Sequence, residues 1–173
     1  ERLRRDAQPI QDIRVADGRV SHGISPFFLH FDHREIGQEP FGYMIENRVT
    51  RRVLLEAVSL LDTTQYLAPN TVAAVVRNAA GVVATLDDGR RIGARLLVAA
   101  DGRKSATRAN AGIQVRETRY AQNAIVATVR HENAHGGVAV EQFLPSGPFA
   151  MLPMTNNRSN IVWTEQAKLA ASY

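Results

Sequence analysis

The 173-residue sequence contains no cysteine, and it has no long apolar run. The absence of cysteine excludes a disulfide framework, a zinc site built on thiolates and a cysteine nucleophile. The longest unbroken apolar segments, such as 96–100, fall far short of the roughly 18 residues that a membrane-spanning helix needs. The composition therefore predicts a protein with an ordinary apolar core, of a length that suits about one domain.

Lysine is also scarce, because only Lys104 and Lys168 accompany the arginines. Lys and Arg total 21 against 17 Asp and Glu, which gives a net charge of +4. Arg2, Arg4 and Arg5 form the only dense basic cluster, and the other arginines are scattered. Proteins that bind nucleic acids usually gather basic residues on one face, with aromatic residues that stack on bases. We therefore expect no nucleic-acid partner, although positive charge of this kind attracts phosphates and membrane surfaces.

The first third of the chain predicts two strands and one helix. Strands are expected over 10–15 and 27–31, with a turn at Asp17-Gly18. A helix is expected over 48–61, with Asn47 as its N-cap. Apolar residues recur at helical spacing along one face of this segment, namely Val49, Val53, Leu54, Ala57, Leu60 and Leu61.

The middle of the chain predicts a hairpin followed by a buried strand. Segments 71–77, 82–86 and 91–95 are expected strands, and Asp88-Gly89 predicts a two-residue type I′ turn. The run 96–100 does not alternate, which is typical of a strand buried on both faces of a parallel sheet.

This run ends at Asp101-Gly102, and a short helix is expected over 105–110, closed by Gly112. Asn156-Asn157 predicts a turn between the last two strands. Further strands are expected over 124–130, 138–144, 150–154 and 160–164. The pattern predicts an α+β or α/β fold, in which a mixed, largely antiparallel sheet is joined to part of a parallel one.

Residues 131–135 read His-Glu-Asn-Ala-His, which matches the H-E-x-x-H pattern of zinc peptidases. That chemistry needs both histidines on one face of a helix. The motif follows the β-rich run 124–129 and precedes Gly136-Gly137, so a polar loop without a metal is expected. A zinc hydrolase that uses His131, Glu132 and His135 is kept as a less favoured alternative.

The segment after the buried strand has the features of a cofactor site. A parallel strand would deliver Asp101 to the edge of the sheet where α/β folds bind ligands. Gly102 allows a close backbone approach, and Arg103, Lys104 and Arg108 add positive charge beside free helix amides. These features suit a phosphate-bearing cofactor, although an Asp-Gly turn before a helix also occurs without one.

Four segments carry a resemblance to known enzymes. Residues 96–108 (LLVAADGRKSATR) resemble the Asp-Gly motif of FAD-dependent aromatic hydroxylases, the para-hydroxybenzoate hydroxylase family. Segments 41–48 (FGYMIENR), 122–127 (QNAIVA, with His131-Glu132 after it) and 143–153 (FLPSGPFAMLP) are similar to the ubiquinone-biosynthesis hydroxylases of that family. The likeness extends from about Pro9 to Glu165, and several linked motifs in order are more specific than any one of them.

The resemblance implies a monooxygenase that uses FAD, NAD(P)H and O₂ to hydroxylate a polyprenylated phenolic ring. It places the Asp-Gly segment beside FAD and Asn47 near the ribityl chain of the flavin. It also makes 143–153 part of the substrate pocket, whereas the residues alone fit a Pro-interrupted strand edge equally well. The implied cofactor-binding residues are Asp101, Gly102, Arg103, Ser105, Arg108 and Asn47, and the implied pocket residues are Phe143, Pro145, Phe149 and Met151. No residue is a convincing catalytic base.

Two glycine motifs of the family are missing. None of the twelve glycines lies two residues from another, so G-x-G-x-x-G is absent, and no Gly-Asp pair occurs. We therefore expect a central fragment of a longer enzyme, inactive by itself and without tight FAD binding. Residues 1–65 would begin the substrate domain and part of the FAD domain, 66–112 would carry the Asp-Gly motif of the FAD domain, and 113–173 would form the substrate-domain sheet.

The implied partner is a lipophilic phenolic small molecule. A peripheral membrane contact or a ubiquinone-biosynthesis complex is a further expectation, with a cytoplasmic location or one at the periphery of the inner membrane. Two further protein classes remain compatible with the sequence. One is a different enzyme of the FAD superfamily, such as a halogenase or a reductase, and the second is a non-catalytic binding module.

Overall fold

The computed structural model describes residues 2–19 and 23–173, and the chain divides into two compact units. One unit contains Glu1–Ala57 and Arg119–Tyr173, and the other contains Val58–Thr118. We call them the sheet unit and the hairpin unit and describe each separately.

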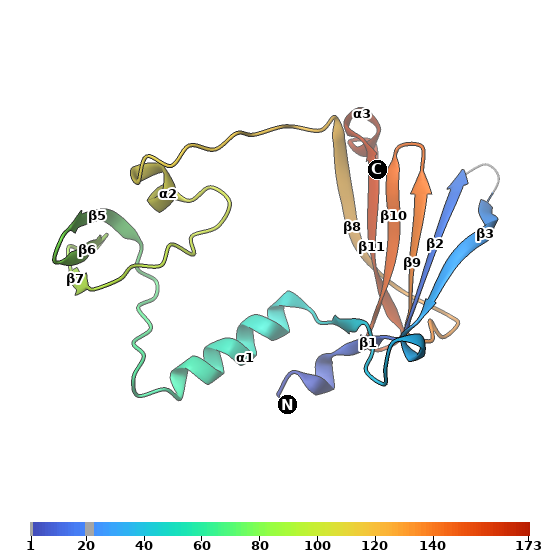
Figure 1. Cartoon of the computed structure of the whole chain (residues 1–173), viewed down its shortest axis with the longest axis horizontal. Helices are drawn as coiled ribbons and strands as arrows, with labels where there is room; N and C mark the ends of the chain where they lie inside the picture. Colours follow the sequence, from blue (N-terminus) through green and yellow to red (C-terminus); the bar gives the residue numbers. More distant parts are fainter. Residues whose placement is uncertain (1, 20–22) are drawn as a thin grey trace. The chain divides into compact units, whose positions relative to one another are not determined.

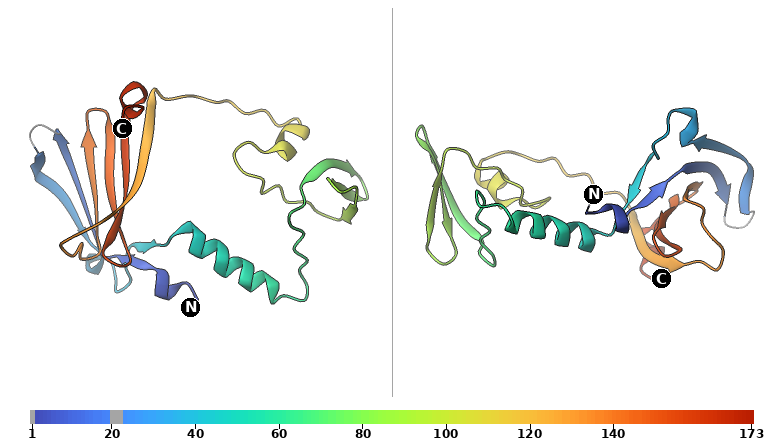
Figure 2. Two further views of the ribbon diagram at one scale, coloured as in Figure 1. Left: turned by 180° about the vertical axis from the view of Figure 1, so that it is seen from behind. Right: turned by 90° about the horizontal axis from the view of Figure 1, so that it is seen from below.

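A six-stranded sheet forms the centre of the sheet unit (Figure 1). Its strand order is β3-β2-β9-β10-β11-β8, and the views in Figure 2 show the same sheet from two further directions. All neighbours are antiparallel except β2 and β9, which run parallel. The strands are β2 (Asp12–Arg19), β3 (Gly23–Asp32), β8 (Gln122–Arg130), β9 (Val138–Leu144), β10 (Gly147–Met154) and β11 (Arg158–Gln166). The predicted mixed, largely antiparallel sheet is confirmed.

The turn between β10 and β11 is the predicted one. Asn156 has φ 63° and Asn157 has φ 51°, as a type I′ turn requires. Asparagine adopts this left-handed conformation more readily than other residues with a side chain. The Asn157 side chain also donates to the carbonyl oxygens of His131 (3.0 Å) and Asn133 (3.1 Å), so it links the turn to the loop after β8.

The predicted turn at Asp17-Gly18 is wrong, because β2 continues through both residues to Arg19. The register against β3 shifts between Ala16 and Gly18, which marks a bulge. The side-chain amide of Gln142 on β9 lies against Gly18, and it would have to move aside for a residue with a Cβ at this position. The link from β2 to β3 lies at 20–22, outside the described residues.

The remaining elements of the sheet unit are short, apart from one helix. Strand β1 (Gln8–Ile10) pairs with β4 (Gly42–Met44), and helix α1 spans Asn47–Ser59. The short helices are η1 (Arg4–Asp6), η2 (His33–Glu35) and α3 (Ala167–Ala170). Among the described residues, no helix is long and apolar enough to cross a bilayer.

Helix α1 confirms the predicted helix, with two differences. Asn47 is the first helical residue and not the N-cap, because the carbonyl oxygen of the preceding Glu46 already accepts from the amides of Val49 and Thr50. The predicted apolar face is only partly covered: Val49 is buried, whereas Leu54 is 55% exposed. Amphipathic spacing alone therefore did not show whether a partner surface covers this face.

The hairpin unit begins with three antiparallel strands, β5 (Val72–Asn78), β6 (Gly81–Leu86) and β7 (Arg91–Ala94). The strands confirm the prediction, but the type I′ turn is wrong. Of the two turn residues, only Gly89 has a positive φ (85°). The Gly89 amide donates to the Leu86 carbonyl oxygen (3.0 Å), and the Leu86 amide donates to the Arg90 carbonyl oxygen (2.8 Å). This arrangement is a three-residue loop in which the glycine takes the left-handed position.

The predicted buried strand at 96–100 is also wrong. The segment is irregular, with Leu96 77% and Val98 78% exposed. A parallel strand needs a neighbour for its hydrogen bonds, and no strand among the described residues pairs with this one. The short helix is present as α2 (Ala106–Asn110), and Gly112 follows it with φ 74°.

Candidate cofactor site

Asp101 is the centre of a hydrogen-bonded junction in the hairpin unit. One carboxylate oxygen accepts from the Ser105 hydroxyl (2.5 Å), and the other accepts from the Thr107 amide (3.1 Å). The same Ser105 oxygen accepts from the Arg108 amide (2.9 Å), and Ser105 is buried. Asp101 and Ser105 therefore cap helix α2 together and hold the loop in one shape.

These bonds change the electrostatics expected at this loop. Donation from the Ser105 hydroxyl and the Thr107 amide lowers the pKa of Asp101 to about 2, so the carboxylate is ionised at neutral pH. The amides of Thr107 and Arg108 are occupied, so the prediction that they are free for a phosphate is wrong. An ionised carboxylate accepts hydrogen bonds from hydroxyl groups and repels phosphate oxygens, so Asp101 itself suits a hydroxyl.

The predicted basic residues lie around this junction. Arg108 is half-buried, and its guanidinium donates to the Arg103 carbonyl oxygen (2.9 Å). Arg103 itself is exposed. Arg108 thus supports the loop while it keeps a positive charge beside it.

The backbone at Gly102, in the loop between Asp101 and α2, has open space beside it. Its φ is 83°, and no atom lies within 4 Å of the position that a Cβ would take. Glycine is needed here for its backbone conformation, and the empty space beside it leaves room for a ligand.

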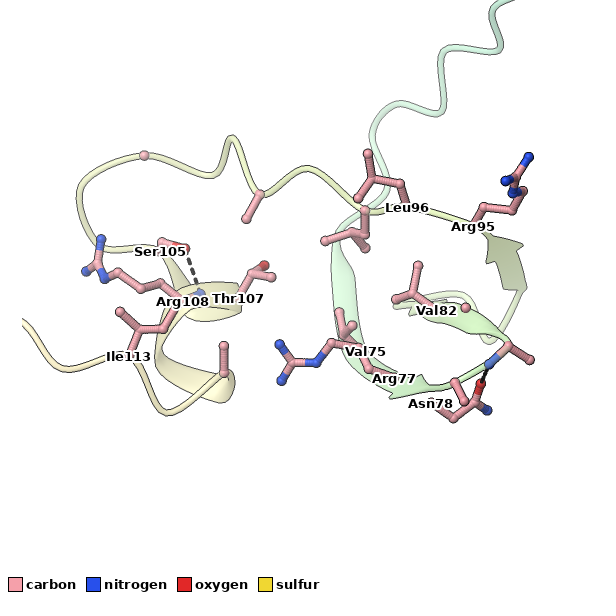
Figure 3. A pocket seen from close by; sticks show the side chains of 17 residues that line it. Val75, Arg77, Asn78, Val82, Arg95, Leu96, Ser105, Thr107, Arg108 and Ile113 are labelled. Carbon is pink, nitrogen blue, oxygen red and sulfur yellow. Dashed lines mark hydrogen bonds between the residues drawn. The ribbon is translucent and has the colours of Figure 1, made fainter.

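A cavity of about 780 Å³ lies next to this loop, entirely within the hairpin unit (Figure 3). The loop and α2 contribute Gly102, Ser105 and Arg108, and the strands contribute Val75 and Arg77 among others. Cavities of this size commonly bind small molecules. Sequence reasoning missed Arg77, whose guanidinium donates to the Asn110 carbonyl oxygen (3.3 Å), because nothing in a strand-end arginine indicates that contact.

In the sheet unit, the register separates the four predicted pocket residues. Phe149 pairs with Gln142, and Phe143 pairs with Pro148, so Phe149 and Phe143 lie on opposite faces of the sheet. Met151 shares the face of Phe149, and Pro145 lies in the turn between β9 and β10. A pocket on one face can therefore include Phe149 and Met151 but not Phe143. The pocket itself stays a prediction.

The sequence analysis also missed an aromatic cluster on the face of Phe149. Trp163 is the cross-strand partner of Phe149, with ring centres 6.5 Å apart, and Tyr173 lies 4.7 Å from Trp163. The indole Nε1 of Trp163 is buried and has no hydrogen-bond partner among the described residues. Alternation along β11 could have indicated this cluster, because it fixes the face of the chain's only tryptophan.

Asn47 belongs to the sheet unit, whereas Asp101 belongs to the hairpin unit. Asn47 is exposed at the first turn of α1, and its role beside a flavin stays a prediction. The preceding residue, Glu46, accepts hydrogen bonds from Arg48 and from Arg158 on β11. These two bonds lower the pKa of Glu46 to about 2.

The H-E-x-x-H motif lies in a loop between β8 and β9, as predicted. The His131 Nε2 is 2.7 Å from the Ser159 hydroxyl. His135 donates from Nε2 to the Met154 carbonyl (3.0 Å) and accepts at Nδ1 from the Gly137 amide (3.0 Å). The motif is not helical, so the two histidines lack the geometry that a zinc hydrolase needs. Both imidazoles instead form hydrogen bonds within the fold. In the described part of the chain, no three ligand-type side chains are grouped for a metal.

A protein-family profile described as "FAD binding domain" matches residues 19–172. The chain belongs to this family. Ubiquinone hydroxylase UbiL of Rhodospirillum rubrum is 51% identical over 164 residues, which are 95% of this chain and 37% of that protein. The 3-demethoxyubiquinol 3-hydroxylase of Escherichia coli is 35% identical over 77% of this chain and 34% of its own length. The chain thus spans about a third of these relatives, and the predicted resemblance is confirmed.

Three solved structures share this fold. PqsL of Pseudomonas aeruginosa, described as a probable FAD-dependent monooxygenase, has a TM-score of 0.83 at 19% identity and covers 99% of this chain and 46% of its own. HpxO of Klebsiella pneumoniae, complexed with FAD and uric acid, has a TM-score of 0.72 at 19% identity, over 92% of this chain and 40% of its own. The halogenase PltM with phloroglucinol and FAD has a TM-score of 0.71 at 11% identity, over 97% of this chain and 37% of its own. At these identities, the likeness establishes the fold alone.

The residues of the hairpin unit fit part of an FAD molecule. FAD carries hydroxyl groups as well as two phosphates, and the ionised Asp101 is an acceptor for a hydroxyl. Gly102 lines the cavity of about 780 Å³, with Arg77, Arg95 and Arg108 as counter-charges for phosphate. Asp101 lines an adjoining cavity of about 550 Å³, which shares Val75 and Thr107 with the first. The hairpin unit of this chain therefore has a cavity whose size and lining residues suit part of FAD.

Proposed function

We propose that this chain is part of a flavin-dependent monooxygenase that hydroxylates a lipophilic, polyprenylated phenolic ring in ubiquinone biosynthesis. The observation that carries the proposal is the 51% identity with ubiquinone hydroxylase UbiL over 95% of the chain. FAD is the cofactor, and NAD(P)H and O₂ are the co-substrates.

FAD, when bound, supplies the redox chemistry by taking electrons from the nicotinamide and activating oxygen. The chain supplies binding and orientation. Asp101 accepts from a cofactor hydroxyl, Gly102 admits the cofactor to the backbone, and Arg108 balances its negative charge. Segment 66–112 is then part of the FAD domain.

The substrate side of the proposal uses the sheet unit. Phe149, Met151 and Trp163 provide an apolar, aromatic face for a phenolic ring, and aromatic pairs favour stacked or edge-to-face contacts of this kind. A polyprenylated substrate partitions into lipid, so a cytoplasmic enzyme at the periphery of the inner membrane, or within a biosynthetic complex, fits the same chemistry.

The test uses the complete flavoprotein that carries these residues. We expect it to purify with FAD and to convert a short-chain prenylphenol to its hydroxylated product, with consumption of NAD(P)H and O₂, in an assay by mass spectrometry. A protein without flavin, or a flavoprotein that gives no oxygenated product, would overturn the proposal. A product that carries chlorine or bromine when halide is added would instead identify a halogenase. Stoichiometric zinc that is lost in His131→Ala would instead identify a zinc hydrolase.

A second measurement concerns the 173-residue chain alone. We expect a fluorescence titration to show no FAD binding at micromolar concentration, because the sequence lacks the glycine motif that holds the pyrophosphate in this family. Micromolar binding would contradict this expectation.

A further inference from the structure

The sheet unit has a cavity lined mainly by arginine side chains, near the start of the chain. It has a volume of about 450 Å³ and is lined by Arg2, Arg5, Arg52, Val53 and Glu56. The first two arginines lie in or beside η1, whereas Arg52 comes from the middle of α1. The fold therefore places Arg52 beside Arg2 and Arg5, two members of the basic cluster that the sequence shows near its start.

These guanidinium groups are only partly neutralised. The Arg52 Nη2 lies 3.8 Å from the Asp6 carboxylate, and the two side chains are 61% and 45% exposed. An exposed pair at this distance contributes little in water. Among the described residues, Arg2 and Arg5 form no ion pair, and Glu56 contributes one negative charge to the lining.

We propose that this cavity, which we call the arginine cavity, binds a phosphate group. Three guanidinium groups around one cavity repel one another, and an anion between them removes that repulsion. Guanidinium donates two parallel hydrogen bonds to phosphate oxygens, and this geometry makes arginine suited to phosphate recognition. The proposal is independent of the flavin site, because every residue involved lies within Arg2–Glu56 of the sheet unit.

A phosphate fits this site better than a carboxylate. A carboxylate offers two oxygens in one plane, whereas a phosphate monoester offers three oxygens in a tetrahedral arrangement and nearly two negative charges at neutral pH. Groups that approach from two different elements, η1 and α1, can each bond to a different phosphate oxygen. The phosphate has two potential sources, a soluble phosphate compound and the headgroup of an anionic phospholipid.

The first experiment titrates the 173-residue chain with inorganic phosphate and with pyrophosphate by calorimetry at low ionic strength. We expect saturable binding that weakens on the order of tenfold in Arg52→Gln and in the double variant Arg2→Gln/Arg5→Gln, because each loses charge-assisted hydrogen bonds. The matched control is Arg91→Gln, which removes one exposed arginine from β7 in the other unit. Melting curves of the variants test whether these exposed substitutions leave the fold intact.

The second experiment separates the two sources. Vesicles that contain phosphatidic acid, whose headgroup is a phosphate monoester, and vesicles of phosphatidylcholine alone are sedimented with the chain and with the same variants. Retention on phosphatidic acid that Arg52→Gln abolishes and Arg91→Gln preserves assigns a lipid headgroup, whereas phosphate binding without retention assigns a soluble compound. The proposal is overturned if neither ligand binds saturably, or if Arg91→Gln weakens binding as much as Arg52→Gln does.

Discussion

The guanidinium of Arg158 donates to the carboxylate of Glu46 across 2.7 Å, and these residues lie 112 positions apart in the chain. Arg158 begins β11, and Glu46 directly precedes α1. Both side chains are less than a quarter exposed. The pair therefore attaches the start of the helix to the sheet, and it was not predicted because neither residue lies in a pattern that indicates a distant partner.

Glu46→Gln should lower the melting temperature by a few degrees at neutral pH. The carboxylate has a pKa of about 2 in the folded chain, below its ordinary value of 4.5, so its ionised form stabilises the fold. This contribution is complete above about pH 4.5 and is lost as the pH falls toward 2. The difference in melting temperature between wild type and variant, followed by circular dichroism, should shrink over that same interval.

Glu35→Gln is the control for this experiment, because it neutralises an exposed carboxylate on η2. Its melting temperature should follow the wild type at every pH. A Glu46→Gln deficit that persists unchanged at pH 2 would show that the pair does not act through the charge of Glu46.

Gly102→Ala should destabilise the hairpin unit by roughly 1–2 kcal/mol, the cost of a left-handed backbone for a residue with a Cβ. The space around Gly102 is open, so the cost arises from φ alone. Gly93→Ala is the matched control, since Gly93 also has open space but no positive φ. Urea unfolding followed in the hairpin unit should separate the two variants, and equal stabilities would mean that Gly102 does not hold this conformation in solution.

Asp101→Asn should weaken FAD retention by the complete flavoprotein on the order of tenfold, because the amide lacks the charge and one of the two acceptor oxygens of the carboxylate. Flavin content after gel filtration and the rate of flavin reduction measure the effect. Asp62→Asn removes a carboxylate from an exposed position of the same unit and should retain FAD as the wild type does. Unchanged flavin content and reduction rate in Asp101→Asn would reject the proposed role.

Asn157→Gly should cost about 1–3 kcal/mol of unfolding free energy, although glycine accepts the left-handed backbone without strain. The loss comes from the side chain, which donates to two carbonyl oxygens and accepts from the His135 amide (3.3 Å). Asn156→Gly changes the same turn at a position of similar φ and should stay within about 0.5 kcal/mol of the wild type. Chemical denaturation compares the two, and equal losses would assign the effect to the backbone.

Signals confined to neighbouring residues predicted much of the fold. The β-branched runs indicated the strands of the hairpin unit, Asn156-Asn157 indicated the turn between β10 and β11, and Ser105 with Gly112 bounded a short helix. The errors occur where distant residues decide the outcome. The run 96–100 has the composition of a buried strand, but a strand forms only when another one pairs with it.

In the candidate site, too, local sequence signals were predictive, whereas features that depend on the fold were not. The Asp-Gly motif located the loop, and Gly102 lines the cavity beside it. The sequence could not show that Asp101 and Ser105 occupy the helix amides, because Asp101 reaches them through a loop whose path depends on the fold. The opposite faces of Phe143 and Phe149, in contrast, follow from strand register once Phe143 is paired with Pro148.

The exposed segment at 96–100 has a practical consequence for work with this chain. Its amides should exchange with deuterium nearly as fast as those of an unfolded peptide, since no strand beside it protects them in the described structure. An extended apolar segment with free amides and carbonyls is also a template on which a second molecule can add a strand. Concentrated samples should therefore self-associate through this segment, and Val98→Lys, which places a charge at a 78% exposed position, should keep them monomeric in sedimentation experiments.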